Sequence, residues 1–129
     1  MMQQKIYTVI RYLFGLSMTL FGLANLFQFM PIHKFPDKAG GLMEAFANSG
    51  YLLPSVGFTQ FVLGIALLSN RFIPLALLCF APVVVNVVLF HVFMDIASIV
   101  MAIPVVAITA YLFAYNKSSF LHLFKSKAL

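Results

Sequence analysis

Apolar residues dominate this chain in four stretches separated by short polar breaks. The stretches run from about residue 7 to 30, 53 to 69, 72 to 94 and 96 to 115. Because about 20 helical residues cross a hydrocarbon core about 30 Å thick, each stretch is long enough, or nearly so, to span a bilayer. The pattern therefore predicts an all-α fold, a four-transmembrane-helix antiparallel bundle that forms one domain over residues 1–129.

Prolines and glycines predict where these helices begin and end. Pro54 and Pro74 stand near the starts of the second and third stretches, where a missing N–H costs nothing, and Pro31 is expected to end the first. The outer loop 31–52 contains a short predicted helix, 41–50, which ends at a glycine and is expected to lie in the membrane interface. Residues 116–129 form a tail.

The composition excludes an ordinary soluble domain. Apolar residues make up 63% of the 129 residues and charged residues only 9%, whereas soluble domains carry about 25% charged residues. The first stretch is also longer than the about 7–15 apolar residues of a signal peptide, which favours a retained helix. We therefore expect an integral membrane protein.

The net charge of +5 comes from basic residues that stand at the ends of the apolar stretches. This pattern suits contact with anionic lipid head groups, and the absence of a basic face argues against nucleic acid as a partner. The positive-inside rule favours both termini on the cytoplasmic side. That side would then carry Lys5, Arg11, Arg71, Lys117, Lys125 and Lys127, and the outer side would carry Lys34 and Lys38.

Small residues recur at spacings of three and four in the first two predicted helices. Gly15 and Gly22 belong to one such stripe, and Gly57 and Gly64 to the other. In a bilayer, small residues let two helix backbones approach closely. These four glycines are therefore predicted to be helix-packing positions.

Three amides are expected at a similar depth in the bundle. At about 1.5 Å per residue, Asn25, Gln60 and Asn86 lie roughly 9–12 Å below the outer ends of their helices. Because an amide facing lipid would lose its hydrogen bonds, all three are predicted to point inward. His91 and Asp95 are four residues apart, so they are expected to share a helix face and to pair as imidazole and carboxylate.

The predicted ligand-binding cluster consists of Asn25, Gln60, Asn86, His91 and Asp95. For His91 the simpler interpretation is a histidine in the membrane interface that Asp95 holds in place. No catalytic residue and no metal site is predicted. The sequence has no H-x-x-x-H, H-E-x-x-H, G-x-S-x-G or glycine-rich phosphate motif. Its single cysteine, Cys79, can form no disulfide within the chain. Catalysis by this chain alone is therefore not expected.

The order of several motifs resembles the DoxX family of small bacterial four-helix membrane proteins. The resemblance rests on Arg11 with Gly15 and Gly22, on 50–54 followed by Gln60 and Gly64, on 70–77, and above all on 81–95. It implies a multi-pass protein of the bacterial inner membrane. Relatives often carry lysine and glutamate where this chain has Asn25 and Gln60, and a neutral pair avoids the cost of burying two charges. This departure puts in doubt any family activity that needs an ionised pair.

Three functions stay open at this point. The first is a non-catalytic accessory or assembly subunit of a larger bacterial membrane complex, which the resemblance suggests to be quinone-linked and redox-active. The second is a protein that binds a quinone or another lipid-like molecule at the polar cluster. The third, less favoured, is a small transporter. The expected partners are membrane lipids and either other membrane subunits or further copies of the chain, and no cofactor is expected within the chain except a quinone or lipid.

Overall fold

The fold is described by a computed structural model that covers residues 1–29 and 34–124. Over these residues the chain is helical and contains no strand. Three helices are long and apolar enough to cross a membrane, namely α1, α3 and α4, which indicates a membrane-associated protein. The elements are α1 (Met2–Phe27), α2 (Asp37–Asn48), α3 (Leu52–Ser69), α4 (Ile73–Phe93), η1 (Ile96–Met101), α5 (Ile103–Tyr115), α6 (Lys117–Phe120) and η2 (Leu121–Phe124).

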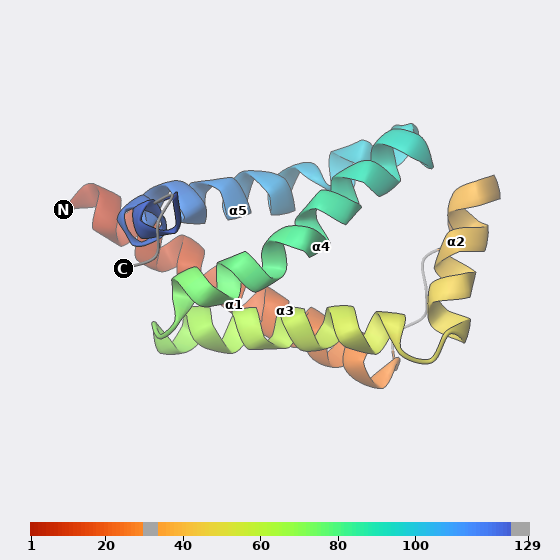
Figure 1. Cartoon of the computed structure of the whole chain (residues 1–129), viewed down its shortest axis with the longest axis horizontal. Helices are drawn as coiled ribbons and strands as arrows, with labels where there is room; N and C mark the ends of the chain where they lie inside the picture. Colours follow the sequence, from red (N-terminus) through yellow and green to blue (C-terminus); the bar gives the residue numbers. More distant parts are fainter. Residues whose placement is uncertain (30–33, 125–129) are drawn as a thin grey trace.

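Helices α1 and α3 pack antiparallel along most of their length, and they form the most extensive contact between elements of the described chain (Figure 1). Their predicted packing glycines lie in this contact. A Cβ on Gly22 would stand 2.5 Å from the Phe61 nitrogen, and a Cβ on Gly57 would stand 2.7 Å from the Gly22 oxygen. Gly15 and Gly64 face each other in the same way, since a Cβ on Gly64 would lie 2.8 Å from the Gly15 oxygen. The glycine prediction is confirmed.

The link between α3 and α4 is short and contains residues with a left-handed backbone conformation. Asn70 closes α3 with a φ of 56°, and its N–H donates to the Ala66 oxygen. Asparagine tolerates this conformation better than most residues. Pro74 follows in the first turn of α4, where it needs no hydrogen-bond partner. Helix α4 leaves this hairpin beside α3 and then diverges from it toward its own C-terminal end (Figure 1).

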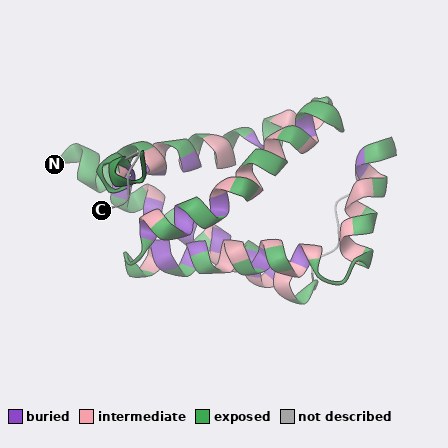
Figure 2. Ribbon diagram, viewed as in Figure 1, coloured by how far each residue is buried: buried purple, intermediate pink, exposed green. Residues whose placement is uncertain are grey.

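The core lies near this hairpin, where α1, α3, α4 and α5 meet (Figure 2). Its largest fully buried side chains are Phe80, Leu63, Leu67, Leu77 and Leu112. The ring of Phe14 meets that of Phe80 edge to face at 6.5 Å. The other end of the molecule contains fewer buried positions, so most of the packing that holds the chain together is at one end.

The fourth apolar stretch is not the single helix that was predicted over 96–115. It consists of a 3-10 helix, η1, followed by the separate α-helix α5. Pro104 stands in the first turn of α5, and because it has no N–H to donate to the carbonyl four residues earlier, α-helical hydrogen bonding does not continue from η1 through this position and a new helix begins there. The sequence prediction overlooked this break.

Other boundaries differ by a few residues. Helix α1 begins at Met2 instead of residue 7 and ends at Phe27, where Gln28 takes a left-handed conformation with a φ of 52°. Its expected end at Met30 and Pro31, and the tail from Lys125 onward, lie outside the described residues. Helix α2 covers Asp37–Asn48 instead of 41–50. It crosses the open end of the molecule between the start of α3 and the end of α4 (Figure 1).

The end of α5 returns to the beginning of α1. The rings of Tyr7 and Tyr115 stack with centroids 3.8 Å apart, and Tyr111 lies 6.5 Å from Tyr7. Such aromatic pairs stabilise a contact beyond the area that they bury. Residues that are more than 100 positions apart in the sequence are therefore at the same level of the bundle.

Candidate functional site

The first two predicted amides bond to each other. Asn25 Nδ2 on α1 donates a hydrogen bond of 2.8 Å to Gln60 Oε1 on α3, and both side chains are half-buried. The close approach of the two helices at Gly22 and Gly57 brings these side chains within reach. The expectation that these two amides point inward is confirmed, and the structure shows that each has the other as its partner, while their role toward a ligand stays a prediction.

The third amide does not join them, so the predicted three-amide cluster is wrong. Asn86 is exposed, and its Nδ2 donates to the Pro82 oxygen of its own helix at 2.8 Å. The physical reason is helix rotation. Asn86 follows the buried Phe80 by six residues, which places it about 120° away from Phe80 around α4. Depth along a helix does not decide which face a side chain occupies.

His91 lies on the buried face of α4 and belongs to a polar group at the start of η1. Its Nδ1 is 3.0 Å from Ser98 Oγ and 3.4 Å from the backbone oxygen of Asp95. The Ser98 hydroxyl in turn donates a hydrogen bond to Asp95 Oδ2. His91 is only 7% exposed. The imidazole, the hydroxyl and the carboxylate are therefore connected by successive hydrogen bonds, and we call this group the His91–Ser98–Asp95 relay.

The direct pairing of His91 with the Asp95 carboxylate was a wrong prediction. Helix α4 ends at Phe93, and Asp95 has an extended conformation with a φ of −152°, so the spacing of four no longer places both residues on one helical face. Ser98 bridges the two instead. Sequence reasoning missed Ser98, although the antiparallel turn predicted at Asp95 was the available signal, because such a turn brings residue 98 back toward residue 91.

The hydrogen bonds of the relay indicate which atoms remain available. Ser98 has one hydroxyl proton, and the carboxylate of Asp95 is its strongest acceptor. Ser98 Oγ then accepts from His91 Nδ1–H, a tautomer inferred from the network. In the neutral ring this leaves Nε2 as an acceptor, and within the described residues no partner bonds to it. A bound molecule with a hydroxyl group could donate to this atom.

Aromatic rings surround this end of α4. The Phe90 ring lies edge to face against the His91 ring at 5.2 Å. Phe35, which precedes α2, packs against Phe90 in the same manner at 5.1 Å. The segment before α2 is thus placed beside the end of α4, and the relay is in apolar surroundings.

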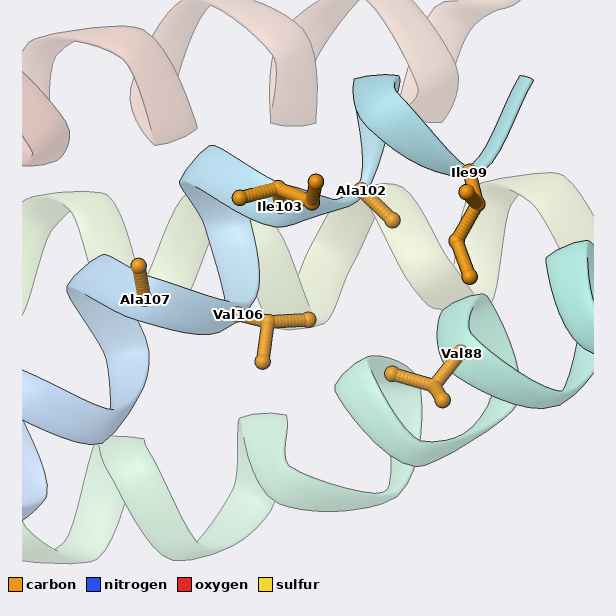
Figure 3. Close-up of a pocket in the computed structure, with 6 residues that line it drawn as sticks. All are labelled: Val88, Ile99, Ala102, Ile103, Val106 and Ala107. Atoms are coloured by element: carbon orange, nitrogen blue, oxygen red, sulfur yellow. The ribbon is translucent and has the colours of Figure 1, made fainter. Parts of the chain in front are cut away.

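An apolar pocket begins about one helical turn from the relay. It has a volume of about 290 Å³ and lies between α4 and α5 (Figure 3). Val88, three residues before His91, lines one side of it, and Ile99, next to Ser98, lines the end formed by η1. The remaining lining residues, all on or just before α5, are Ala102, Ile103, Val106 and Ala107. The change from η1 to α5 near Pro104 lies along this wall, so the break described above shapes the pocket.

The sequence reasoning also missed the structural role of an arginine whose guanidinium is buried. Arg11, read from the sequence as a topology signal, is only 6% exposed, and its Nη1 donates to the Leu67 oxygen. Leu67 is in the last turn of α3, where carbonyls have no partner in the helix and where a positive charge is favourable. The guanidinium also lies 4.4 Å from the ring of Tyr12. The signal available in the sequence was an arginine near the start of one helix, which an antiparallel neighbour places at its own C-terminal end.

No metal site is formed by the described residues, because no three His, Cys, Asp or Glu side chains among them gather closely enough. Comparison with family models, with curated proteins and with solved structures finds no match for the chain. The resemblance to the DoxX family is therefore neither supported nor refuted by them, and the function must be argued from the site itself.

Proposed function

We propose that this chain binds a lipid-like molecule with a polar head, of the quinone class or similar, between α4 and α5. The observation that carries the proposal is the apolar pocket that begins about one helical turn from the His91–Ser98–Asp95 relay and is lined by Val88 and Ile99. Small-molecule sites are typically apolar cavities with a few convergent polar groups. The pocket would hold part of the apolar chain of the ligand, and His91 would hydrogen-bond its head.

The relay suits either form of such a head. Neutral His91 accepts a hydrogen bond at Nε2 from a hydroxyl. In the other tautomer of the neutral ring, Nε2–H donates to a carbonyl oxygen, and Nδ1 accepts from the Ser98 hydroxyl. This is a binding role for the three residues, and it needs no chemical step in the chain. Asn25 and Gln60 act here as a pair that joins α1 to α3 instead of as ligand contacts.

We propose the following topology for the bundle. The six residues of η1, at about 2.0 Å each, and the thirteen of α5, at about 1.5 Å each, together extend about 30 Å. This is about the thickness of a hydrocarbon core, so the two elements form the fourth crossing. Both termini are then cytoplasmic by the charge rule, α2 lies in the outer interface, and the DoxX resemblance suggests the bacterial inner membrane.

The test compares two alanines of α5 that are both exposed. Ala107 lines the pocket and Ala110 does not. Protein purified in mild detergent is analysed by native mass spectrometry, and the bound molecule is extracted and identified. We expect Ala107→Phe to lower occupancy by about fivefold or more, since overpacking costs about 1–3 kcal/mol, and Ala110→Phe to leave it unchanged. Equal occupancy in the wild type and in both variants would overturn the proposal.

A second candidate is the accessory or assembly subunit of a larger membrane complex. The observation that favours it is the small share of each apolar helix that the chain itself covers: 33% of the most apolar window of α1, 28% of that of α3 and 22% of that of α4 are buried. Such surface fits lipid and neighbouring membrane subunits alike. Co-purification of a tagged chain in mild detergent separates the two, because an accessory subunit brings a defined partner protein in constant ratio. A chain that always purifies alone would contradict this candidate.

A further inference from the structure

The side of α4 that faces away from the core carries a regular seam. Residues at alternating spacings of four and three are exposed along the whole helix, and we call this set the α4 seam: Leu75, Cys79, Pro82, Asn86, Leu89 and Phe93. A spacing that averages 3.5 residues is the signature of two helices that coil around each other. The seam is opposite the buried Leu77 and Phe80, so it is available to a second helix.

Asn86 is the polar member of the seam and lies at depth. It is the fourteenth of the 21 residues of α4, about 10 Å from the C-terminal end of the helix at 1.5 Å per residue. One N–H of its amide bonds to the Pro82 oxygen. The second N–H and Oδ1 have no partner among the residues that the structure describes. Within hydrocarbon, such groups must find one outside the chain.

An asparagine amide is its own complement, because it offers both a donor and an acceptor. Two copies inserted in the same orientation, related by a two-fold axis along the membrane normal, bring each seam residue opposite itself. The free N–H of one Asn86 then meets Oδ1 of the other. A single asparagine at such a core position specifies register and oligomeric state in paired helices. Neither a lipid tail nor an apolar helix could satisfy this amide.

We propose that α4 pairs in parallel with α4 of a second copy of this chain, with Asn86 opposite Asn86. This inference does not rest on the proposed ligand site. Val88, which lines the pocket, follows Asn86 by two residues and therefore lies about 160° from it around the helix. A dimer through the seam leaves the pocket uncovered, and a failed ligand test would leave the dimer intact.

The native chain contains a suitable reporter, because Cys79 is its single cysteine and lies on the seam two turns before Asn86. Membranes that contain the chain at low density are treated with a mild thiol oxidant and analysed on a non-reducing gel. We expect a disulfide-linked dimer whose mass is twice that of the chain. In the matched control the cysteine is moved off the seam, as Cys79→Ala with Ala110→Cys, and we expect this variant to stay monomeric.

Asn86→Leu tests the amide itself. Interhelical hydrogen bonds in membranes contribute amounts that correspond to about a threefold to twentyfold change in dissociation constant, and we expect a loss of association in this range when labelled chains are diluted with lipid. Circular dichroism should show unchanged helix content, because among the described residues the exposed Asn86 side chain forms no hydrogen bond beyond its own helix. A cross-linked product of any other mass, equal cross-linking from residue 110, or an unchanged dissociation constant in Asn86→Leu would each overturn the proposal.

Discussion

Adding one methyl group at Gly22 should separate the two helices that form the centre of the fold. The Cβ of an alanine there would lie 2.5 Å from the Phe61 nitrogen and 2.8 Å from the Gly57 oxygen. Both atoms belong to the backbone of α3, so no side-chain rotation can relieve the contact. The helices must move apart, and the packing on either side of Gly22 is loosened with them.

The magnitude follows from two opposing terms. Overpacking typically costs about 1–3 kcal/mol, whereas replacing a helical glycine by alanine gains up to about 1 kcal/mol in helix propensity. Gly41 provides the matched control, since it is in helix α2 and a Cβ there would meet nothing within 4 Å. Both Gly22→Ala and Gly41→Ala gain helix propensity, so this gain cancels when the two variants are compared. The difference between their unfolding free energies should therefore be about 1–3 kcal/mol, with Gly22→Ala the less stable.

The assay is reversible unfolding in mixed detergent micelles, followed by far-ultraviolet circular dichroism. The chain has no tryptophan, so helix content is a better signal than intrinsic tryptophan fluorescence. Gly22→Ala should unfold at lower denaturant than the wild type, and Gly41→Ala at equal or higher denaturant. If the two variants have unfolding free energies within about 0.5 kcal/mol of each other, a spread typical of substitutions at unconstrained surface sites, the close approach of α1 and α3 at Gly22 is refuted.

Two further substitutions test the polar contacts of the same helix pair. Arg11→Leu removes the hydrogen bond to the Leu67 oxygen and should lower the unfolding free energy by about 1.5–3 kcal/mol, while Arg71→Leu, at an exposed arginine, should change it by no more than about 0.5 kcal/mol; equal effects would contradict the capping role of Arg11. For Asn25→Leu and Gln60→Leu, a double-mutant cycle should give a coupling free energy of about 0.6 kcal/mol and at most about 1.7 kcal/mol. Strict additivity of the two substitutions would show that the amides do not bond to each other.

The two proposals about binding concern different sides of α4. The buried face ends in His91 and borders the pocket, and the exposed face carries the seam with Asn86. One helix can therefore hold a ligand within the chain and a second copy outside it. The stretch 81–95 thus contributes to two polar groups with separate roles, Asn86 on one side of α4 and His91 with Asp95 on the other, instead of to one cluster.

Much of the fold could be predicted from the sequence, because the lipid solvent restricts the choices. Long apolar stretches in a bilayer must be helical, and three of the four expected helices form with boundaries within a few residues of the expected ones. The glycines predicted as helix-packing positions lie where α1 and α3 approach each other, since only small residues allow backbones so close together. The cost of an unpaired amide predicted that Asn25 and Gln60 point inward, and the structure shows that they bond to each other.

Only the tertiary structure decided how each helix is rotated about its axis, where a helix is interrupted, and which residues far apart in the sequence come into contact. Asn86 was predicted on the wrong face, because every side of α4 is apolar and no periodicity marks the inner one. The turn that follows α4 brings Ser98 to His91, and the break near Pro104 shapes the pocket. The bond of Arg11 to the end of α3 arises only when two distant helices lie side by side. The sequence determined which segments are helical, and the packing of helices that are apolar on all sides determined where their few polar groups point.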